Sequence, residues 1–289
     1  MSSFDLAVAY RICPQVGKTA HNLPFSHNKL ELSEACLRSF RNSLGELRVK
    51  LWVLLDGCPG EYHEIFRKYF APEQLVLVPL PGIGNLPTFE QQIDILLKQR
   101  DAELVYFAED DYFYLPGQFG AMTDFLMANN DADFVTPYDH MDCYRLNLHD
   151  RPKWLRVAGN HHWRTAASTC LTFLTRRSTL AETQAVFRSY ARGNSDASLW
   201  LSLTKESVWD PFRLARYAAN NHWLAKIMLK AWLYNWNQIL FGRRRKLWVP
   251  IPGVATHMDA NALSPTIDWR NQMQSQPESS RASLTPQSY

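Results

Sequence analysis

The sequence has 289 residues and a mass of 33.5 kDa, with 46% hydrophobic and 20% charged residues and with 31 basic against 28 acidic side chains. This is the composition of a globular protein whose core needs neither disulfides nor a structural metal. The net charge of +3 and the absence of a basic run longer than residues 243–246 exclude the extended basic surface that nucleic-acid binders need.

The N-terminal residues 1–10 lack the basic region with which a signal peptide begins. The five cysteines are odd in number and form no CxxC pair, which is typical of a reducing compartment. No stretch contains the roughly 18 to 20 consecutive apolar residues of a membrane-spanning helix. We therefore expect a cytoplasmic protein.

Strands and helices are predicted to alternate in the first half of the chain. Apolar runs predict strands at residues 6–12, 49–55, 75–80 and 102–108, and periodic apolar spacing predicts helices at 30–47, 62–70 and 88–99. This order favours an α/β fold with a Rossmann-like, mostly parallel and doubly wound sheet flanked by helices.

The second half has fewer strands among longer helices and loops. Strands are predicted at residues 133–137, 168–174 and 247–251, and a helix is expected to begin near Pro116. We expect one domain over residues 1–274, with a nucleotide-binding half of about 1–115 and an acceptor half of about 116–274. Residues 275–289, which are rich in Ser, Gln and Pro, are predicted to form a disordered tail.

Polar residues lie at or shortly after the carboxyl end of each of the first four predicted strands. Ligands of open α/β sheets bind outside the carboxyl ends of the strands, so these positions predict a site. The residues are Tyr10 and Arg11, Asp56, Asn85, and Glu109, Asp110 and Asp111. For each one alone, a turn or cap is the simpler interpretation; together they favour a binding site.

The three consecutive carboxylates Glu109, Asp110 and Asp111 are the most specific feature. Their mutual repulsion is unfavourable unless a cation lies close by, and hard divalent cations prefer oxygen ligands. The alternative is an acidic turn that caps the following helix.

A strand that ends in Glu-Asp-Asp after a Rossmann-like half resembles the GT-A glycosyltransferases, particularly the inverting family 2 type. The resemblance covers about residues 6–259, but only the acidic triplet and its strand are specific. It implies that Tyr10, Arg11, Asp56, Asn85, Glu109 and Asp110 bind a nucleotide sugar, UDP-linked by preference. It also implies that Asp111 coordinates Mn²⁺ or Mg²⁺, which stabilises the diphosphate leaving group.

The same resemblance implies a catalytic base and a further metal ligand. Asp196, in Gly193-Asn194-Ser195-Asp196, is the best match to the acid that deprotonates the acceptor hydroxyl, although Ser195 replaces the usual acidic neighbour. Asp139 and Asp142 are rival bases, and Asp196 could instead be a favourable charge at a helix N-terminus. His257 follows the strand at 247–251 and is the expected second metal ligand; a hydrogen-bonded surface histidine is the alternative.

Residues 211–246 combine many aromatic side chains with the basic run at 243–246. This pattern is compatible with a helix in a membrane interface, on the inner face of the membrane, and then with a lipid-linked acceptor. The alternative is that the aromatic side chains pack against the sheet or line an acceptor pocket.

The function favoured is transfer of a sugar from a nucleoside diphosphate to a hydroxyl acceptor, such as a sugar, glycan or lipid-linked group, with inversion. Two alternatives stay open. One is a catalytically silent scaffold or carbohydrate-binding protein with the same fold. The other is a sugar-phosphate nucleotidyltransferase, which is disfavoured because the residues after the first strand, 10–15, contain no glycine.

Overall fold

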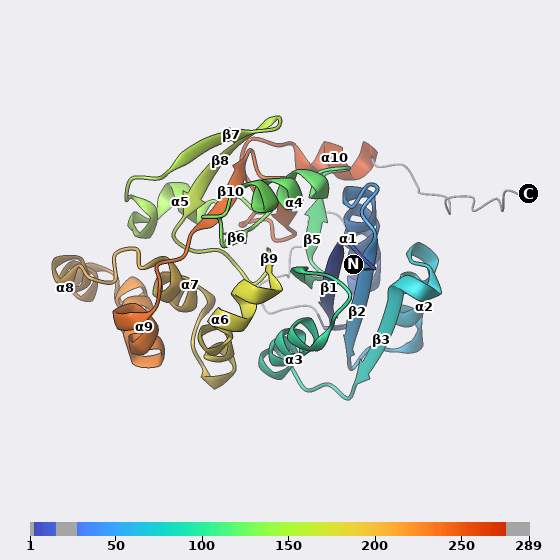
Figure 1. The fold of residues 1–289 in the computed structure, drawn as a ribbon, viewed down its shortest axis with the longest axis horizontal. Coiled ribbons are helices and arrows are strands. Elements are labelled where there is room, and N and C mark those ends of the chain that lie inside the picture. The colour runs from blue at the N-terminus through green and yellow to red at the C-terminus, as the bar shows by residue number, and fades with distance from the viewer. Residues whose placement is uncertain (1–2, 16–27, 276–289) are drawn as a thin grey trace, which may run out of the picture.

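The computed structural model describes residues 3–15 and 28–275. Within them, nine strands form one sheet in the order β3-β2-β1-β4-β9-β6-β10-β8-β7, with helices on both faces (Figure 1). β1, β2, β3 and β4 are all parallel. β9 is antiparallel to β4 and β6, and β8 is antiparallel to β10 and β7. The predicted α/β class with a mostly parallel sheet is confirmed.

The strands of this sheet are β1 Leu6–Ile12, β2 Val49–Asp56, β3 Leu75–Leu80, β4 Leu104–Glu109, β6 Phe134–Val135, β7 Leu155–Ala158, β8 His161–Ala166, β9 Phe173–Arg176 and β10 Leu247–Ile251. A separate pair joins β5 Tyr112–Tyr114 to β11 Ala255–His257. The α-helices are α1 Lys29–Ser43, α2 Gly60–Tyr69, α3 Asn85–Lys98, α4 Phe119–Ala128, α5 Asp142–Arg145, α6 Arg177–Arg188, α7 Asp196–Thr204, α8 Pro211–Asn220, α9 His222–Phe241 and α10 Trp269–Ser275. Short 3₁₀ turns are η1 Pro72–Gln74, η2 Asn147–His149 and η3 Tyr190–Arg192.

β1 shows why the sheet is covered on both faces. All seven of its residues are buried, and alternate side chains enter two different cores. Val8 packs in the core that contains Phe40 of α1, whereas Ala9 packs in the core that contains Phe89 of α3. A strand buried on both sides has a continuous apolar sequence, which is why its position was predictable.

The predictions for β1, β3 and β10 match the observed strands, and those for β2, β4 and α1 to α3 differ only at their ends. The strand predicted at 168–174 is observed as β9, at Phe173–Arg176. Its polar first half leaves the sheet because the side chains there make other contacts, including a hydrogen bond between Thr169 and Thr136 of 3.1 Å. The strand predicted at 133–137 is reduced to the two residues of β6.

The β7–β8 hairpin was not predicted. β7 is largely exposed, and β8, although mostly buried, has the polar sequence His-His-Trp-Arg-Thr-Ala, so neither strand has an apolar pattern. A signal was present in Gly159-Asn160, a dipeptide typical of tight hairpin turns, and Gly159 has a positive φ of 57°.

α7, α8 and α9 form a further apolar cluster beside the sheet, which includes Leu201, Tyr217, Leu224 and Met228. Trp232 of α9 packs edge-to-face on Trp209. Part of the aromatic 211–246 segment is therefore packed against protein. Among the described residues, no helix is long and apolar enough to cross a membrane. Of the tail predicted at 275–289, Ser275 is instead the last residue of α10, and residues 276–289 lie outside the described residues.

His149 in η2 is a buried histidine that is expected to make stability depend on pH. Burial, together with the charges of Lys153 and Arg164, lowers its pKa to about 3, against the opposing effect of Asp150. An unfolded chain protonates this imidazole below a pH of about 6.5, so between about 6.5 and 3 the unfolded state binds more protons. The contribution of His149 to the free energy of unfolding is therefore fully present above a pH of about 6.5. Between a pH of about 6.5 and about 3 it should fall as the pH falls, by up to about 1.4 kcal/mol per pH unit.

Urea unfolding of the wild type and His149→Gln at several pH values measures this contribution. The free energy of unfolding of the wild type should fall relative to that of His149→Gln as the pH falls from 7 to 4. A difference that stays constant across that range would contradict the assignment.

Candidate active site

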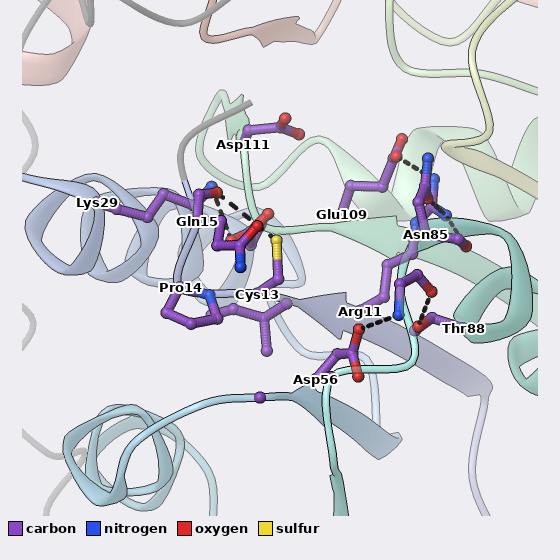
Figure 2. A pocket seen from close by; sticks show the side chains of 15 residues that line it. Arg11, Cys13, Pro14, Gln15, Lys29, Asp56, Asn85, Thr88, Glu109 and Asp111 are labelled. Atoms are coloured by element: carbon purple, nitrogen blue, oxygen red, sulfur yellow. Dashed lines mark hydrogen bonds and ion pairs between the residues drawn. The ribbon is translucent and has the colours of Figure 1, made fainter. Parts of the chain in front are cut away.

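The carboxyl ends of β1, β2 and β4 and the loop after β3 open onto one pocket with a volume of about 500 Å³. This volume is within the roughly 300 to 1,000 Å³ of small-molecule sites. Figure 2 shows Arg11, Glu109 and Asn85 grouped on one side and Lys29, Cys13 and Gln15 on the other. The pocket is lined by Arg11, Ile12, Cys13, Pro14, Gln15, Lys29, Asp56, Gly57, Gly82, Gly84, Asn85, Thr88, Glu109, Asp110 and Asp111.

Asp56 fixes the loop that follows β3. Its two carboxylate oxygens accept hydrogen bonds from the backbone amides of Ile83, at 2.6 Å, and Gly84, at 2.8 Å. Gly84 has a φ of 89°, a conformation that favours glycine, and it is the N-cap residue of α3. Asp56 thus holds the start of α3 at the pocket, and only 7% of its surface is exposed.

We expect Asp56→Asn to destabilise the protein. The uncharged amide offers one acceptor oxygen where the carboxylate offers two, so one loop amide loses its acceptor and the other keeps only a neutral one, at a cost of about 1.5 to 3 kcal/mol. Urea unfolding measures this loss, with Asp124→Asn on the exposed surface of α4 as the control, expected to change little. Equal stability of Asp56→Asn and wild type would contradict this role.

Glu109 belongs to a network that connects three parts of the pocket wall. It pairs with Arg11 of β1, and its second oxygen accepts a hydrogen bond of 2.7 Å from Thr172. Arg11 also donates to the side-chain oxygen of Asn85, whose amide nitrogen donates to the hydroxyl of Tyr190 at 3.1 Å. Both oxygens of Glu109 are therefore already bound within the protein.

Asp110 is likewise neutralised from within the chain. Its Oδ2 lies 2.8 Å from Nζ of Lys29 and 3.1 Å from the hydroxyl of Ser33, both on α1. Burial raises the pKa of Asp110, and the charge of Lys29 opposes that rise. Because Glu109 and Asp110 are bound within the protein, Asp111 is the residue of the acidic triplet that could bind a cation.

Asp111 has one engaged oxygen and one without a partner. Its Oδ2 lies 3.1 Å from Nε2 of His257 on β11, whereas Oδ1 is buried and makes no hydrogen bond within the described residues. The imidazole lowers the pKa of Asp111, although burial acts in the opposite direction. The charge of Asp111, working against burial, raises the pKa of His257 to about 9. β5 and β11, which bring these two residues together, pair through His257 and Tyr112.

The lining residues carry more negative than positive charge. Four carboxylates, Asp56, Glu109, Asp110 and Asp111, face the two cations Arg11 and Lys29. An anionic ligand such as a diphosphate would be repelled by this excess unless a cation entered with it. Among the described residues, however, no group of three or more His, Cys, Asp or Glu side chains is arranged to hold a metal ion. Asp111 and His257 could supply two ligands, and the remainder would have to come from the ligand and water.

Asp196 is the first residue of α7 and is not among the lining residues. Burial raises its pKa, and the charge of Glu109 adds to that rise. Its Oδ1 accepts a hydrogen bond of 2.7 Å from the amide of Ala197, as an acid at a helix N-terminus can. Its position therefore agrees with both interpretations made from the sequence.

The two rival bases differ in their surroundings. Asp139 is 1% exposed, pairs with Arg164 and accepts a hydrogen bond from the hydroxyl of Tyr144, which accounts for both of its oxygens. Asp142, at the start of α5, is more exposed, and its Oδ2 lies 3.5 Å from Nδ1 of His140. A carboxylate bound like Asp139 is poorly placed to take a proton from a ligand.

Tyr10 does not lie where the sequence suggested. Its side chain is 1% exposed and packs against Phe40 and Phe66 in the core, with ring centroids 5.9 and 5.3 Å away. It is not among the residues that line the pocket. Contact between Tyr10 and a nucleotide base is not supported by this position, because alternation along β1 turns Tyr10 toward α1 and Arg11 toward the pocket.

Lys29 was missed by the sequence analysis. It begins α1, directly after the N-cap Asn28, where a positive charge opposes the helix dipole. This unfavourable position was the available signal, since it suggests that the charge is needed there. Thr172 was missed because it lay inside a predicted strand.

Comparisons of the sequence with protein-family models and with curated proteins give no match. Among solved structures, the chain is similar to a putative nucleotide-diphospho-sugar transferase from Desulfovibrio desulfuricans G20, with a TM-score of 0.44 and 13% identity over 83% of this chain and 99% of that one. It is similar to an active-site mutant of LgtC, with a TM-score of 0.42 and 8% identity over 92% and 99% of the two chains.

A third similar structure is CMP:2-keto-3-deoxy-manno-octonic acid synthetase in complex with CTP, with a TM-score of 0.39 and 8% identity over 74% of this chain and 86% of that one. These similar structures thus include both a putative nucleotide-diphospho-sugar transferase and a synthetase that binds CTP. Because the identities and TM-scores are this low, we infer function from the pocket itself.

Proposed function

We propose that this protein is a metal-dependent glycosyltransferase of the GT-A type, which transfers a sugar from a nucleoside diphosphate to a hydroxyl acceptor. The observation that carries the proposal is the state of the acidic triplet. Glu109 and Asp110 are neutralised by Arg11 and Lys29, whereas Asp111 directs an oxygen without a partner into the same region. An unpartnered buried carboxylate oxygen is unfavourable in a protein that needs no cation there.

The residues around Asp111 fit a divalent cation. Carboxylate oxygen and imidazole nitrogen are both ligands that Mn²⁺ accepts, and Mg²⁺ accepts the oxygen. Asp111 and His257 would hold the ion, with diphosphate oxygens and water as further ligands. When bound, the ion would stabilise the negative charge that develops on the departing diphosphate.

The other residues of the pocket have roles in binding and orientation. Asp56 keeps the loop of Gly82 and Gly84 in place at the start of α3, whose first residue, Asn85, lines the pocket. Arg11 and Lys29 compensate Glu109 and Asp110, the carboxylates nearest to them, which leaves Asp111, paired among the described residues only with His257, to meet the ion. Arg11, Asp56, Asn85, Glu109 and Asp110 would thus shape the nucleotide-sugar site without contacting the ion.

The proton of the acceptor hydroxyl would move to Asp196. A base that takes a proton at neutral pH benefits from a raised pKa, and burial raises that of Asp196. With the base and the leaving group on opposite sides of the reacting carbon, a single displacement would invert the configuration. Inversion and a UDP-linked donor are supported by the resemblance of the sequence to inverting family 2 enzymes.

A sugar-phosphate nucleotidyltransferase is the second candidate, because an acidic pocket with Arg11 and Lys29 could also position a nucleoside triphosphate. A scaffold that keeps the fold without catalysis is the third. The Oδ1 atom of Asp111 argues against the scaffold, because a buried carboxylate oxygen without a partner has no evident structural benefit.

Phosphorus NMR of the reaction products separates these activities. The purified protein is incubated with Mn²⁺ and each nucleotide sugar, with water in place of the acceptor, and separately with nucleoside triphosphates and sugar phosphates. Release of a nucleoside diphosphate from one nucleotide sugar supports the proposal. Release of pyrophosphate from a triphosphate supports the nucleotidyltransferase, and no product in either reaction supports the scaffold.

A further inference from the structure

α9 presents an apolar surface that no described part of the protein covers. We call it the α9 face and define it by Trp223, Lys226, Leu229, Leu233, Trp236, Leu240 and Phe241. Leu233 is 71% exposed and Phe241 77%, and the other apolar members are between 43% and 55% exposed. Monomeric soluble proteins rarely expose contiguous apolar surfaces of this kind without a binding role.

The exposed residues recur at the spacing of one helix face. Lys226, Leu229 and Leu233 are separated by three or four positions, so they lie on one side of the first part of α9. Trp236 and Leu240 continue this spacing beyond Asn235, where a φ of −136° kinks the helix. The opposite side of the helix is used for folding, since Leu224, Ile227, Met228 and Ala231 are buried in the cluster with α7 and α8. α9 is thus apolar on both sides, and only one side is explained by the core.

Not all of the basic side chains of α9 and its neighbouring segments are paired with acidic residues. Residues 211–246 contain eight basic and no acidic side chains, although the whole chain has nearly as many acidic as basic residues. Five of these eight residues form ion pairs: Arg213 with Asp150, Arg243 and Arg245 with Asp133, Arg244 with Glu206, and Lys246 with Asp131. Within the described residues, neither Arg216 of α8 nor Lys226 of α9 forms an ion pair, and both are exposed.

The surroundings of the face also fix its orientation. α9 is tied to the rest of the protein through Tyr234, whose hydroxyl donates to the carbonyl of Arg192 at 3.0 Å, and through Lys230, whose Nζ lies 2.6 Å from the carbonyl oxygen of Gly193. Figure 1 shows α8 and α9 together at one end of the molecule, beyond α7 and away from β1, β2 and β3. α9 is therefore held in place at one end of the molecule, where the side chains of the α9 face are exposed.

We propose that the α9 face docks on an anionic lipid bilayer. Leu, Trp and Phe side chains would enter the boundary between headgroups and acyl chains, and the basic side chains without acidic partners would meet negative headgroups. An acidic protein surface would match the charge but offers less reason for four large aromatic and aliphatic side chains exposed on one helix. The proposal is independent of the activity proposed above.

Flotation of the full chain with lipid vesicles tests the proposal. Vesicles of phosphatidylcholine alone are compared with vesicles of phosphatidylcholine and phosphatidylglycerol. The wild type should float with the anionic vesicles and much less with the neutral ones. Reversal of one charge in Lys226→Glu should weaken the binding by more than about tenfold.

Leu155→Glu is a matched control for Leu233→Glu, because both leucines are 71% exposed but Leu155 is on β7. Leu233→Glu should abolish flotation, and Leu155→Glu should leave it unchanged. Leu240→Glu serves as a second variant of the face if Leu233→Glu fails to fold, which circular dichroism reports.

Three results would overturn the proposal. The first is failure of the wild type to float with either kind of vesicle. The second is equal loss of binding in Leu155→Glu and Leu233→Glu. The third is self-association of the vesicle-free protein in sedimentation, lost in Leu233→Glu, without any vesicle binding, which would assign the face to a second copy of the chain.

Discussion

Asp111→Asn is expected to remove the metal-dependent part of nucleotide binding and to leave the metal-independent part intact. The substitution keeps the size of the side chain but removes the charge and the free carboxylate oxygen that would hold the ion. It also makes the pocket less negative, so a diphosphate without metal should bind no more weakly than it does to the wild type. This substitution therefore separates metal-dependent from metal-independent binding of the nucleotide.

Calorimetric titration with a nucleoside diphosphate, with Mn²⁺ and with chelator, measures both parts. For the wild type, we expect the affinity with Mn²⁺ to exceed that with chelator by at least about tenfold, which corresponds to about 1.4 kcal/mol. For Asp111→Asn the two affinities should coincide. Asp124→Asn, on the exposed surface of α4, should behave like the wild type. An unchanged response of Asp111→Asn to Mn²⁺ would remove Asp111 from the metal site.

Asp196→Asn is expected to lower kcat by about 10²- to 10⁴-fold, the contribution usual for a general base. The affinity for the donor should change little, because Asp196 lies outside the pocket lining. In the wild type the rate should rise with pH as Asp196 loses its proton, and the raised pKa places this rise at a higher pH than for an exposed aspartate. That rise should be absent in the variant.

Steady-state rates and donor affinities of Asp196→Asn, Asp139→Asn and Asp142→Asn decide between the three acids. Asp139→Asn should primarily lose stability, because it leaves Arg164 buried without its partner, at a cost of about 3 to 5 kcal/mol. Asp142→Asn should be close to wild type. A variant of Asp196 with wild-type kcat would leave Asp196 only the role of a favourable charge at the start of α7.

The strands that position the pocket were predictable because they are buried on both faces. A continuous apolar run as short as that of β1 or β4 predicts a buried strand. The polar residue at its end then marks the edge of the sheet. Order along the chain then brings Arg11, Asp56 and Glu109 to one edge, as the pocket shows.

The partners of those residues were less predictable, because they depend on side-chain direction and on distant segments. A shift of one residue along a strand reverses the direction of a side chain, which explains why Tyr10 is in the core while Arg11 reaches the pocket. The pairs of Asp110 with Lys29 and of Asp111 with His257 join residues from separate elements. No local pattern in the sequence states which carboxylate each cation will neutralise.

The composition of residues 211–246 indicated that an exposed apolar surface was possible, but the sequence pattern did not show which side chains form it. The sequence showed aromatic residues beside basic ones, which fits a packed helix and an interfacial helix equally. Only the exposed fractions separate them: Trp232 and Leu224 are used in packing, whereas Leu233 is 71% exposed. Propensity and periodicity cannot distinguish these cases because the helix is apolar on both sides.

The central claim is that the pocket binds a nucleoside diphosphate together with a divalent cation. Thermal unfolding of the wild type with UDP, GDP, CDP and ADP, each with Mn²⁺ and with chelator, tests it most directly. At a ligand concentration of about 100 times the dissociation constant, linkage adds roughly 2.7 kcal/mol, which raises Tm by several degrees. We predict such a rise with one of the nucleotides, only when Mn²⁺ is present. No rise with any nucleotide, or an equal rise with chelator, would contradict the account.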